Sequence, residues 1–325
     1  MKRVAVLGAG AWGTAIAASL GARLDVSLWA RRPEQAAAMR SARRNEAYLP
    51  GFDLPDPVRV TAQLPEALQG ATLVLAATPV SGLREVLAGV GDVPIVWLCK
   101  GFEEQTGLLP HQVAAQVLGA QATCGVLSGP SFAEEVAAGL PCALTLASSS
   151  AGFAQDAAAL LHGARMRVYY STDLIGVEVG GAVKNVMAIA AGICDGLSLG
   201  HNARAALITR GLAEIGRLSA ALGGRHETVM GLTGAGDLIL TATGDLSRNR
   251  RVGLELARGR PLATILASLG HVAEGVRSAK EVARLARARE VEMPVTDAVN
   301  AVLDARLAPA DAVQMLLSRD PRGER

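Results

Sequence analysis

The sequence places charged side chains in surroundings where charged residues are unusual. Lys184 and Asn185 lie within Gly180–Gly192, whose other residues are small or apolar on every side of a helix. A buried ammonium costs free energy unless it is paired, and desolvation lowers its pKa toward a range useful for proton transfer. Asp237, in a glycine-rich loop, would keep such an ammonium charged if the two lie close. The alternatives are a lysine whose amine reaches solvent and an acid that is only a turn residue.

A second group of residues has the chemistry of an anion site. Ser247 stands at the N-cap position of an expected helix that begins with Arg248 and Asn249. Backbone N–H groups at a helix start, together with an arginine side chain, bind small anions well. The alternative is a basic helix face that only contacts solvent.

The N-terminal segment carries a glycine pattern typical of dinucleotide binding. Gly8–Gly13 reads G-x-G-x-x-G directly after an expected strand and opens an expected helix. Gly8 would make the tight turn, Gly10 would let a pyrophosphate approach the backbone, and Gly13 would let helix and strand pack closely. The alternative is a glycine turn with a structural role only.

The end of the second expected strand, Val26–Trp29, indicates which dinucleotide binds. An NAD site usually places an acid there for the ribose 2′-OH, but here Arg31 and Arg32 follow the strand and Asp25 lies at its start. Two guanidinium groups suit a 2′-phosphate, so the sequence favours NADP(H) and leaves NAD(H) open. The arginines could instead be surface charges. Tyr48 lies near the cofactor or only packs its own loop.

Ligands of doubly wound sheets bind beyond the carboxyl ends of the strands, where two more residues are expected. Pro79 follows the strand expected at Thr72–Ala77 and is expected to line the cofactor. Lys100 follows the buried strand expected at Ile95–Leu98. Its alternative is a solvated loop lysine.

The segment Gly129–Glu135 follows a further expected strand and combines two signals. Ser131 and Glu134 have the S-x-x-E spacing of a capping box, and Gly139 suits the C-terminus of the same helix. We therefore expect Ser131 to cap that helix and also to border the ligand crevice.

Composition argues against several other classes of function. The formal net charge of +2 over 325 residues implies neither a nucleic-acid nor a membrane-surface partner. The four cysteines and five histidines are scattered, which predicts no metal site and no disulfide framework and fits a cytoplasmic protein. Glycines interrupt the apolar N-terminus that otherwise resembles a signal peptide, and no uninterrupted apolar stretch is long enough to span a bilayer.

Short apolar runs alternate with helical patterns in the first half of the chain. This alternation predicts an α/β fold, with βαβ units in a Rossmann-type, doubly wound, mainly parallel sheet. The expected strands are Val4–Leu7, Val26–Trp29, Val58–Val60, Thr72–Ala77, Ile95–Leu98, Gly125–Leu127 and Ala143–Leu146, and the first two helices are Ala11–Leu20 and Pro33–Arg44.

From about Ser171 onward, strand-like runs give way to long helical stretches. We therefore predict two domains: residues 1–175 bind the dinucleotide, and residues 176–325 form an all-helical domain with the substrate and catalytic residues. The expected helices are Leu174–Asp195, Ala203–Leu222, Arg248–Arg258, Pro261–Leu269, Ser278–Arg289 and Val295–Leu303.

Taken together, these motifs resemble those of the bacterial-type NAD(P)-dependent glycerol-3-phosphate dehydrogenases, over essentially the whole chain. Ordered matches in both halves are far more specific than the glycine loop alone. One departure is Thr241–Gly244, which reads TATG where the family commonly has TCTS. The matching segments are GAGAWGTA at Gly8–Ala15, Lys100-Gly101, GPSFA at Gly129–Ala133, GAVKNV at Gly181–Val186, GLTGAGD at Gly231–Asp237, LSRN at Leu246–Asn249 and AEGV at Ala273–Val276.

The resemblance implies roles for individual residues. Lys184 resembles the family's proton donor and acceptor, held in place by Asp237, and Lys100 resembles a lysine that touches both substrate and nicotinamide. With Asn185 included, the expected substrate contacts are Lys100, Gly129, Ser131, Lys184, Asn185, Asp237, Ser247, Arg248 and Asn249. The implied cofactor contacts, beyond the glycines and arginines already named, are Ala11, Trp12, Lys100, Ala133, Arg248, Val272 and Glu274.

The resemblance also implies an activity, the interconversion of dihydroxyacetone phosphate and sn-glycerol 3-phosphate by hydride transfer, which would supply glycerol phosphate for phospholipid synthesis. The partner is then a small phosphorylated molecule, with no nucleic acid or membrane insertion, and the oligomeric state stays open, a homodimer included. One rival is a two-domain reductase of a non-phosphorylated keto or hydroxy acid, which would not need the anion site at Ser247–Asn249. The other is a non-enzymatic NADP(H)-binding sensor, which would leave a buried Lys184 without a purpose.

Overall fold

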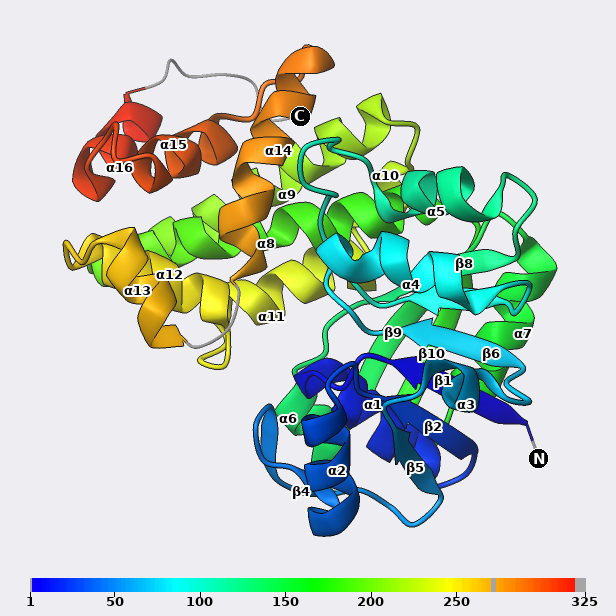
Figure 1. The fold of residues 1–325 in the computed structure, drawn as a ribbon. Coiled ribbons are helices and arrows are strands. Elements are labelled where there is room, and N and C mark those ends of the chain that lie inside the picture. The colour runs from blue at the N-terminus through cyan, green and yellow to red at the C-terminus, as the bar shows by residue number, and fades with distance from the viewer. Residues whose placement is uncertain (1, 270–272, 319–325) are drawn as a thin grey trace. The chain divides into compact units, whose positions relative to one another are not determined.

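The computed structural model describes residues 2–269 and 273–318, and the chain divides into two compact units (Figure 1). The first unit is Met1–Glu178 and the second is Val179–Arg325. The division falls inside helix α8 (Leu174–Gly196), after residue 178, where the sequence pattern places it after residue 175.

The first unit is built on an eight-stranded sheet with the strand order β10-β9-β8-β7-β6-β1-β2-β5. Every neighbouring pair is parallel except β8 with β9. This arrangement confirms the mainly parallel, doubly wound sheet predicted from the sequence. The strands are β1 (Arg3–Leu7), β2 (Asp25–Trp29), β5 (Val58–Thr61), β6 (Leu73–Ala76), β7 (Ile95–Trp97), β8 (Cys124–Ser128), β9 (Cys142–Ala147) and β10 (Met166–Ser171).

Alternate residues of the strands face two separate apolar cores. In β1, Val4 and Val6 belong to one core, whereas Ala5 and Leu7 belong to the other. The first core is covered by α1 (Ala11–Gly21), α2 (Pro33–Ala42), α6 (Ala133–Ala137) and α7 (Ala151–Leu161). The second is covered by α3 (Leu64–Leu68), α4 (Leu83–Val90), α5 (Pro110–Leu118) and the beginning of α8 (Figure 1).

Helix α2 ends at Ala42, two residues before the end predicted from its sequence. Arg43 takes a left-handed conformation with φ 52°, and its guanidinium donates hydrogen bonds to three backbone carbonyls in segment 54–58. Arg44 then begins strand β3 (Arg44–Asn45), which forms a hairpin with β4 (Leu49–Asp53). The tertiary hydrogen bonds of Arg43 therefore override its helix propensity.

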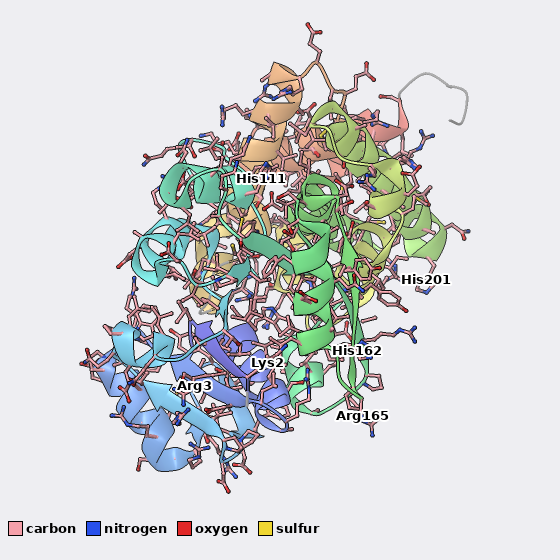
Figure 2. The ribbon with its side chains drawn as sticks, turned by 90° about the vertical axis from the view of Figure 1, so that its right-hand side faces the viewer. Lys2, Arg3, His111, His162, Arg165 and His201 are labelled. Carbon is pink, nitrogen blue, oxygen red and sulfur yellow. The ribbon has the colours of Figure 1, made fainter. Side chains whose placement is uncertain are left out.

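A buried acid ties three elements of the first unit together. One carboxylate oxygen of Glu178, on α8, accepts hydrogen bonds from Trp97 Nε1 and the backbone N–H of His111, each at 2.9 Å. The other carboxylate oxygen lies 2.5 Å from His111 Nδ1. His111 lies on helix α5 (Figure 2). Burial raises the pKa of Glu178. Burial also lowers the pKa of His111, but the hydrogen bond and charge of Glu178 raise it overall.

In the described part of the second unit the chain forms helices and turns, as predicted. After α8 come α9 (Gly200–Ala221), α10 (His226–Val229), the π-helical turn η2 (Leu232–Gly236), α11 (Asp237–Thr243), α12 (Arg248–Ala257), α13 (Leu262–Leu269), α14 (Glu274–Ala288), α15 (Pro294–Leu303) and α16 (Pro309–Leu317).

Helix α8, with 23 residues, is the one described helix that is long and apolar enough to cross a membrane by length and composition. Its apolar run is interrupted by Glu178, Lys184 and Asp195, so the expectation that no uninterrupted apolar stretch spans a bilayer is not contradicted. However, 89% of its most apolar window is buried inside the protein, as expected for a core helix. The length and apolarity of α8 are therefore explained by packing.

Helices α8 and α12 approach each other until their backbones touch. A Cβ atom built on Gly192 would lie 2.0 Å from the carbonyl oxygen of Arg250, and one built on Gly253 would lie 2.1 Å from that of Ile189. No side chain fits at these two positions, so glycine is required for α12 to lie directly on α8.

Glu214 is a buried acid that stabilises the beginning of α15. Its carboxylate accepts hydrogen bonds from the backbone N–H groups of Val295, at 2.6 Å, and Thr296, at 3.2 Å, and from the Thr296 hydroxyl. These backbone groups lie in the first turn of α15, where N–H groups have no partner within the helix. Burial raises the pKa of Glu214 to about 7, although the three hydrogen bonds act in the opposite direction.

We predict that Glu214 makes the protein less stable as pH rises from about 4.5 to about 7. With its pKa raised from 4.5 to about 7, this carboxyl binds more protons in the folded state across that interval, so ionising it removes up to about 3 kcal/mol of stability. Urea unfolding at several pH values should show a flatter profile for Glu214→Gln than for the wild type. Glu227→Gln, at an exposed acid of α10, serves as the control. Parallel profiles for the wild type and Glu214→Gln would contradict the prediction.

Candidate active site

The glycine loop of the first unit has the shape that its sequence pattern predicts. Gly8 has φ 121°, and a Cβ built there would lie 2.8 Å from the carbonyl oxygen of Ala77. A Cβ on Gly13 would lie 1.9 Å from the carbonyl oxygen of Gly8. At Gly10, by contrast, a Cβ would meet no atom within 4 Å. The protein itself requires the first and third glycines, whereas the second leaves open space beside the start of α1.

Two side chains hold this loop from the α2 and β3 side. Asn45 Nδ2 donates to the carbonyl of Ala9 at 3.0 Å and to Thr14 Oγ1 at 2.7 Å, and Gln35 Nε2 donates to the same carbonyl at 2.7 Å. Among the described residues, the buried Asn45 Oδ1 has no partner. Helix α1 begins after Gly10, which has no side chain to cap it. Open space, an uncapped helix start and a vacant acceptor together fit the phosphates and ribose of a dinucleotide.

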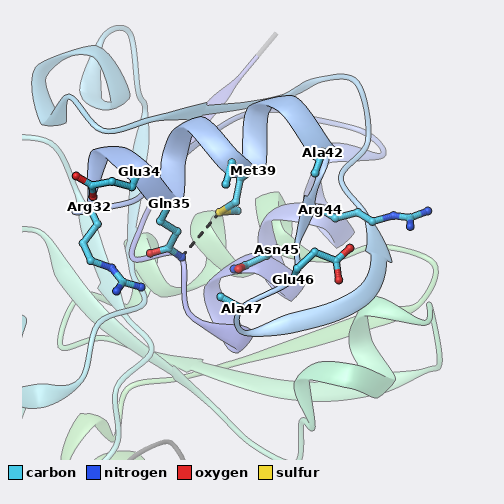
Figure 3. Close-up of a pocket in the computed structure, with 10 residues that line it drawn as sticks. Arg32, Glu34, Gln35, Met39, Ala42, Arg44, Asn45, Glu46 and Ala47 are labelled. Atoms are coloured by element: carbon cyan, nitrogen blue, oxygen red, sulfur yellow. Dashed lines mark hydrogen bonds between the residues drawn. The ribbon is translucent and has the colours of Figure 1, made fainter.

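A pocket of about 380 Å³ lies beside this loop, between α2 and the β3–β4 hairpin (Figure 3). Arg32 lies at its edge, and its Nη2 atom is 3.1 Å from the hydroxyl of Tyr48, with the guanidinium 5.9 Å from the ring centre. Both Arg31 and Arg32 are exposed. Asp25, the acid at the other end of β2, pairs with two arginines of neighbouring strands and is not at the strand tip. The lining residues are Arg32, Glu34, Gln35, Ala38, Met39, Ala42, Arg44, Asn45, Glu46 and Ala47.

Further residues predicted at the cofactor also lie around α1. Ala11 and Trp12 form its first turn and are partly buried against the first core. Ala133 begins α6, which packs against α1. Pro79 follows β6, and Ala77 and Thr78, just before it, are the backbone that Gly8 approaches.

The structure brings Lys100, Gly129 and Ser131 together at the ends of β7 and β8. Lys100 Nζ donates to the carbonyl of Gly129 at 3.2 Å, and Ser131 Oγ donates to the same carbonyl at 3.0 Å. The predicted capping box at Ser131 and Glu134 is wrong. Helix α6 begins at Ala133 with Phe132 as its N-cap, so Ser131 lies one residue too early to cap it. The prediction for Gly139 is confirmed, since it follows the C-cap with φ 72°.

In the second unit, Lys184 is buried in α8 and paired. Only 7% of the residue is exposed, and its Nζ atom lies 2.5 Å from Asp237 Oδ1 and 2.8 Å from Thr241 Oγ1. Asp237 is 1% exposed and begins α11. The side chain of Lys184 therefore does not extend to solvent, and Asp237 is more than a turn residue because it pairs with the Lys184 amine. Buried charges of opposite sign at this distance keep each other ionised.

Thr241 also belongs to this cluster, although the sequence pattern predicted no role for it. Its hydroxyl donates to the carbonyl of Asp237 at 2.6 Å and accepts from Lys184. The available signal was its spacing, because residues four apart on a helix share a face and Asp237 begins that helix.

A second polar cluster surrounds Asn185, the neighbour of Lys184. Asn249 Nδ2 donates to Asn185 Oδ1 at 3.0 Å, and Asn249 Oδ1 accepts from the backbone N–H of Gly275 at 3.0 Å. Glu274 Oε2 lies 3.5 Å from Asn185 Nδ2. A Cβ on Gly275 would lie 2.5 Å from the carbonyl oxygen of Asn185, so only glycine permits this contact. The structure thus joins α8, α12 and the beginning of α14 at one point.

The expected anion site lies at the beginning of α12. Ser247 is its N-cap, as predicted, and its hydroxyl accepts from the backbone N–H of Arg250 at 3.2 Å. Arg248 is exposed, and within residues 2–269 and 273–318 it forms no ion pair. Val272, expected at the cofactor, lies outside the described residues.

Both halves of the chain match models of one protein family. Residues 3–154 match the N-terminal region, and residues 173–314 the C-terminal region, of NAD-dependent glycerol-3-phosphate dehydrogenase. The chain belongs to this family. It is therefore an oxidoreductase, as the resemblance implies.

Individual relatives agree with this assignment. A glycerol-3-phosphate dehydrogenase [NAD(P)+] from Dechloromonas aromatica is 56% identical over 326 residues, 99% of each chain. The crystal structure of a glycerol-3-phosphate dehydrogenase from Coxiella burnetii is 43% identical, covers 98% of this chain and 99% of its own, and has a TM-score of 0.93. A ketopantoate reductase from Ralstonia eutropha, at 17% identity with 96% and 99% coverage and a TM-score of 0.59, shares the fold only.

We predict opposite consequences for two alanine substitutions in the glycine loop of this family member. Gly13→Ala should strongly lower the melting temperature, because its methyl group would overlap the backbone of Gly8. Gly10→Ala should leave the melting temperature within a few degrees of the wild-type value, because its methyl group would meet no atom of the protein. It should raise the Kd of NADPH at least tenfold, because the methyl group would occupy the open space expected to receive the pyrophosphate. Thermal unfolding and fluorescence titration with NADPH measure the two effects. Unchanged NADPH affinity in Gly10→Ala would place the dinucleotide elsewhere.

Proposed function

We propose that this chain interconverts dihydroxyacetone phosphate and sn-glycerol 3-phosphate with NAD(P)H, and that Lys184 donates and accepts the proton. The observation that carries the proposal is the buried ammonium of Lys184, which bonds to Asp237 and Thr241. Membership of the glycerol-3-phosphate dehydrogenase family supports the same substrate pair. In this proposal the first unit binds the dinucleotide and the second binds the substrate.

The phosphate of the substrate binds at the beginning of α12 in this proposal. Arg248 supplies a full positive charge from an exposed side chain, and the first turn of α12 adds its helix dipole and backbone N–H groups. Asn249 contributes mainly by position, because its side chain bonds to Asn185 and Gly275. A doubly charged phosphate fits a site that combines an arginine with a helix start.

Lys184 acts on the oxygen of the substrate. When bound, the reduced nicotinamide supplies a hydride to carbonyl C2. The oxygen at C2 then develops negative charge, which the Lys184 ammonium stabilises before it donates a proton to that oxygen. In the oxidising direction the neutral amine removes the hydroxyl proton. Asp237 holds the Nζ atom in place and stabilises its charged form.

Lys100 and Ser131 align the substrate from the first unit. Both side chains bond to the carbonyl of Gly129, which fixes them at the ends of β7 and β8. At that position Lys100 adds positive charge near the reacting carbonyl and the nicotinamide, while Ser131 and Gly129 contact the substrate. Ligands of doubly wound sheets bind at these strand ends, which supports the assignment.

The rival functions have less support. A reductase of a non-phosphorylated acid would bind a singly charged carboxylate, whereas Arg248 together with the start of α12 also suits a doubly charged phosphate. A sensor without catalysis leaves unexplained why an ammonium is buried at the cost of its hydration. The shared fold of the ketopantoate reductase does not favour its substrate here, because one fold serves many reactions. We further propose that the protein is a cytoplasmic enzyme that supplies glycerol phosphate for phospholipid synthesis. A homodimer is the candidate assembly.

We predict that Lys184→Ala lowers kcat by about 10²- to 10⁴-fold, the range typical of a lost acid–base group. Asp237 then stays buried without this partner, so the melting temperature should also fall, but the Kd of NADPH should remain near the wild-type value. NADPH absorbance after addition of dihydroxyacetone phosphate measures the rate, with Lys280→Ala, at an exposed lysine, as the control. A Lys184→Ala protein with wild-type turnover would remove Lys184 from the mechanism.

For the cofactor, we propose a preference for NADP(H) over NAD(H). The support is the exposed pair Arg31 and Arg32 beyond β2, with Arg32 held beside a pocket by Tyr48. Glu34 also lines this pocket and is the lining acid nearest to these arginines in sequence. The net charge at this edge of the pocket therefore depends on Arg31 and Arg32.

We predict that the double substitution Arg31→Ala/Arg32→Ala raises the KM for NADPH at least tenfold and changes the KM for NADH less than threefold. The lost interaction is with the 2′-phosphate, which only NADPH carries. Initial rates with each cofactor measure this, and Arg40→Ala, an exposed arginine later on α2, is the control. Equal effects on both cofactors would show that the arginines do not select the 2′-phosphate.

A further inference from the structure

A cluster of ion pairs lies next to the expected phosphate-binding turn and has no role in the chemistry described so far. Asp195, in the last turn of α8, accepts hydrogen bonds from Arg204 Nη1 at 3.0 and 3.1 Å. Its Oδ2 atom also accepts from Arg250 Nε at 2.9 Å, and Arg250 Nη2 lies 2.8 Å away. The side chains of Asp195 and Arg250 are 14% and 13% exposed. This ion pair is therefore largely shielded from solvent, and salt screens its charges less than those of an exposed pair.

Arg250 belongs to the same helical turn as the residues expected to bind phosphate. It is the third residue of α12, and its backbone N–H completes the cap by donating to Ser247 Oγ. Its carbonyl contacts the backbone of α8 at Gly192. Its side chain, in turn, bonds to Asp195 at the end of α8. The cap of α12 is thus anchored to α8 through both the backbone and the side chain of one residue.

The anchor fixes the direction in which Arg248 projects. Successive residues of an α-helix are about 100° apart, so Arg248 and Arg250 project about 200° apart, on nearly opposite sides of α12. Arg250 is turned toward α8, and the exposed Arg248 is turned away from it. Holding one arginine against Asp195 therefore sets the rotation of the turn that presents the other.

We infer that Asp195 and Arg250 are positioning residues that orient the first turn of α12 for binding of the substrate phosphate. This inference rests on the proposed phosphate site at Ser247–Asn249. Neither residue touches the substrate. Asp195 acts through Arg250, and Arg250 acts through the cap and the orientation of Arg248.

The structure provides a matched pair of substitutions for a test. Arg250 Nη1 also bonds to Asp245 Oδ1 at 2.9 Å, but Asp245 lies in the turn before α12 and its side chain is 97% exposed. Asp195→Asn and Asp245→Asn remove the same charge from the same arginine, but only Asp195 anchors α12 to α8. Removing a negative charge near an anion site should tighten phosphate binding if the electric field alone matters. Positioning predicts the opposite for Asp195→Asn.

The experiment measures the inhibition constant of inorganic phosphate as a competitor of dihydroxyacetone phosphate, together with the KM for each substrate. Asp195→Asn should raise the inhibition constant of phosphate and the KM for dihydroxyacetone phosphate about tenfold, equivalent to about 1.4 kcal/mol. The KM for NADPH, and kcat/KM with unphosphorylated dihydroxyacetone, should stay within twofold of wild type. Asp245→Asn should leave the inhibition constant of phosphate unchanged or slightly lower. Arg250→Lys keeps the positive charge but loses the two-point contact with Asp195, so it should raise the phosphate inhibition constant less than Asp195→Asn does. It serves as the second variant if the Asp195→Asn protein does not fold.

Three results would overturn the inference. One is an unchanged or lowered phosphate inhibition constant in Asp195→Asn, or in Arg250→Lys where that variant replaces it. Another is an equal rise of the phosphate inhibition constant in Asp245→Asn. The third is a loss of kcat/KM with dihydroxyacetone, in Asp195→Asn, as large as the loss with dihydroxyacetone phosphate. Arg248→Ala, measured in parallel, tests the proposed site itself and should raise the KM for dihydroxyacetone phosphate far more than that for NADPH. If Arg248→Ala raises the phosphate inhibition constant and Asp195→Asn does not, only the positioning role fails. If Arg248→Ala leaves it unchanged, the proposed phosphate site fails as well.

Discussion

The buried pair of Lys184 and Asp237 is the interaction on which the arrangement of the second unit depends. Each charge has lost nearly all contact with water, and a buried charge without its partner costs several kcal/mol. The two side chains come from α8 and α11, so these helices must keep a fixed register for the pair to form. Thr241 strengthens that requirement, because its hydroxyl bonds to both partners from the next turn of α11.

Such precision is achieved by bringing backbones into direct contact. Gly192 and Gly253 let α8 and α12 touch, and Gly275 lets the beginning of α14 contact Asn185 and Asn249. A packed side chain between two helices can adjust its rotamer, whereas two backbones in contact have almost no freedom to shift. The helix that carries Lys184 therefore also determines where the first turn of α12 lies. The low aromatic content of the chain is consistent with packing of this kind.

The parts of the fold that follow local periodicity could be predicted from the sequence, and the parts that depend on tertiary contacts could not. Most strands of the sheet and the long helices lie within a few residues of their predicted bounds. Strand β10 was missed because it is an edge strand whose exposed residues include Tyr169 and Tyr170, which hides its apolar alternation. The end of α2 was misplaced because the hydrogen bonds of Arg43 reach a segment more than ten residues away.

The candidate site divides in the same way. Burial of Lys184 could be predicted, since its helical neighbours are apolar on every side, and the N-cap at Ser247 follows from its residue type and position. The capping box at Ser131 shows the weakness of a short pattern, because a start only one residue later turned its hydroxyl toward Gly129. The ion pair of Asp195 and Arg250 has no pattern at all, since its partners are 55 residues apart and meet only through packing.

In the proposed mechanism, separate elements of the second unit carry the proton transfer and the recognition of phosphate. Lys184 belongs to the interior of α8, where a substitution disturbs the core, whereas Arg248 is exposed at the start of α12. Substrate recognition can therefore change at the surface of α12 without disturbing the buried pair. The ketopantoate reductase that shares this fold at 17% identity shows the same framework in a protein named for another substrate, as expected when one fold serves several reactions. If the proposed phosphate site is right, the side chain at position 248, together with the contacts that orient it, separates a phosphorylated substrate from an unphosphorylated one.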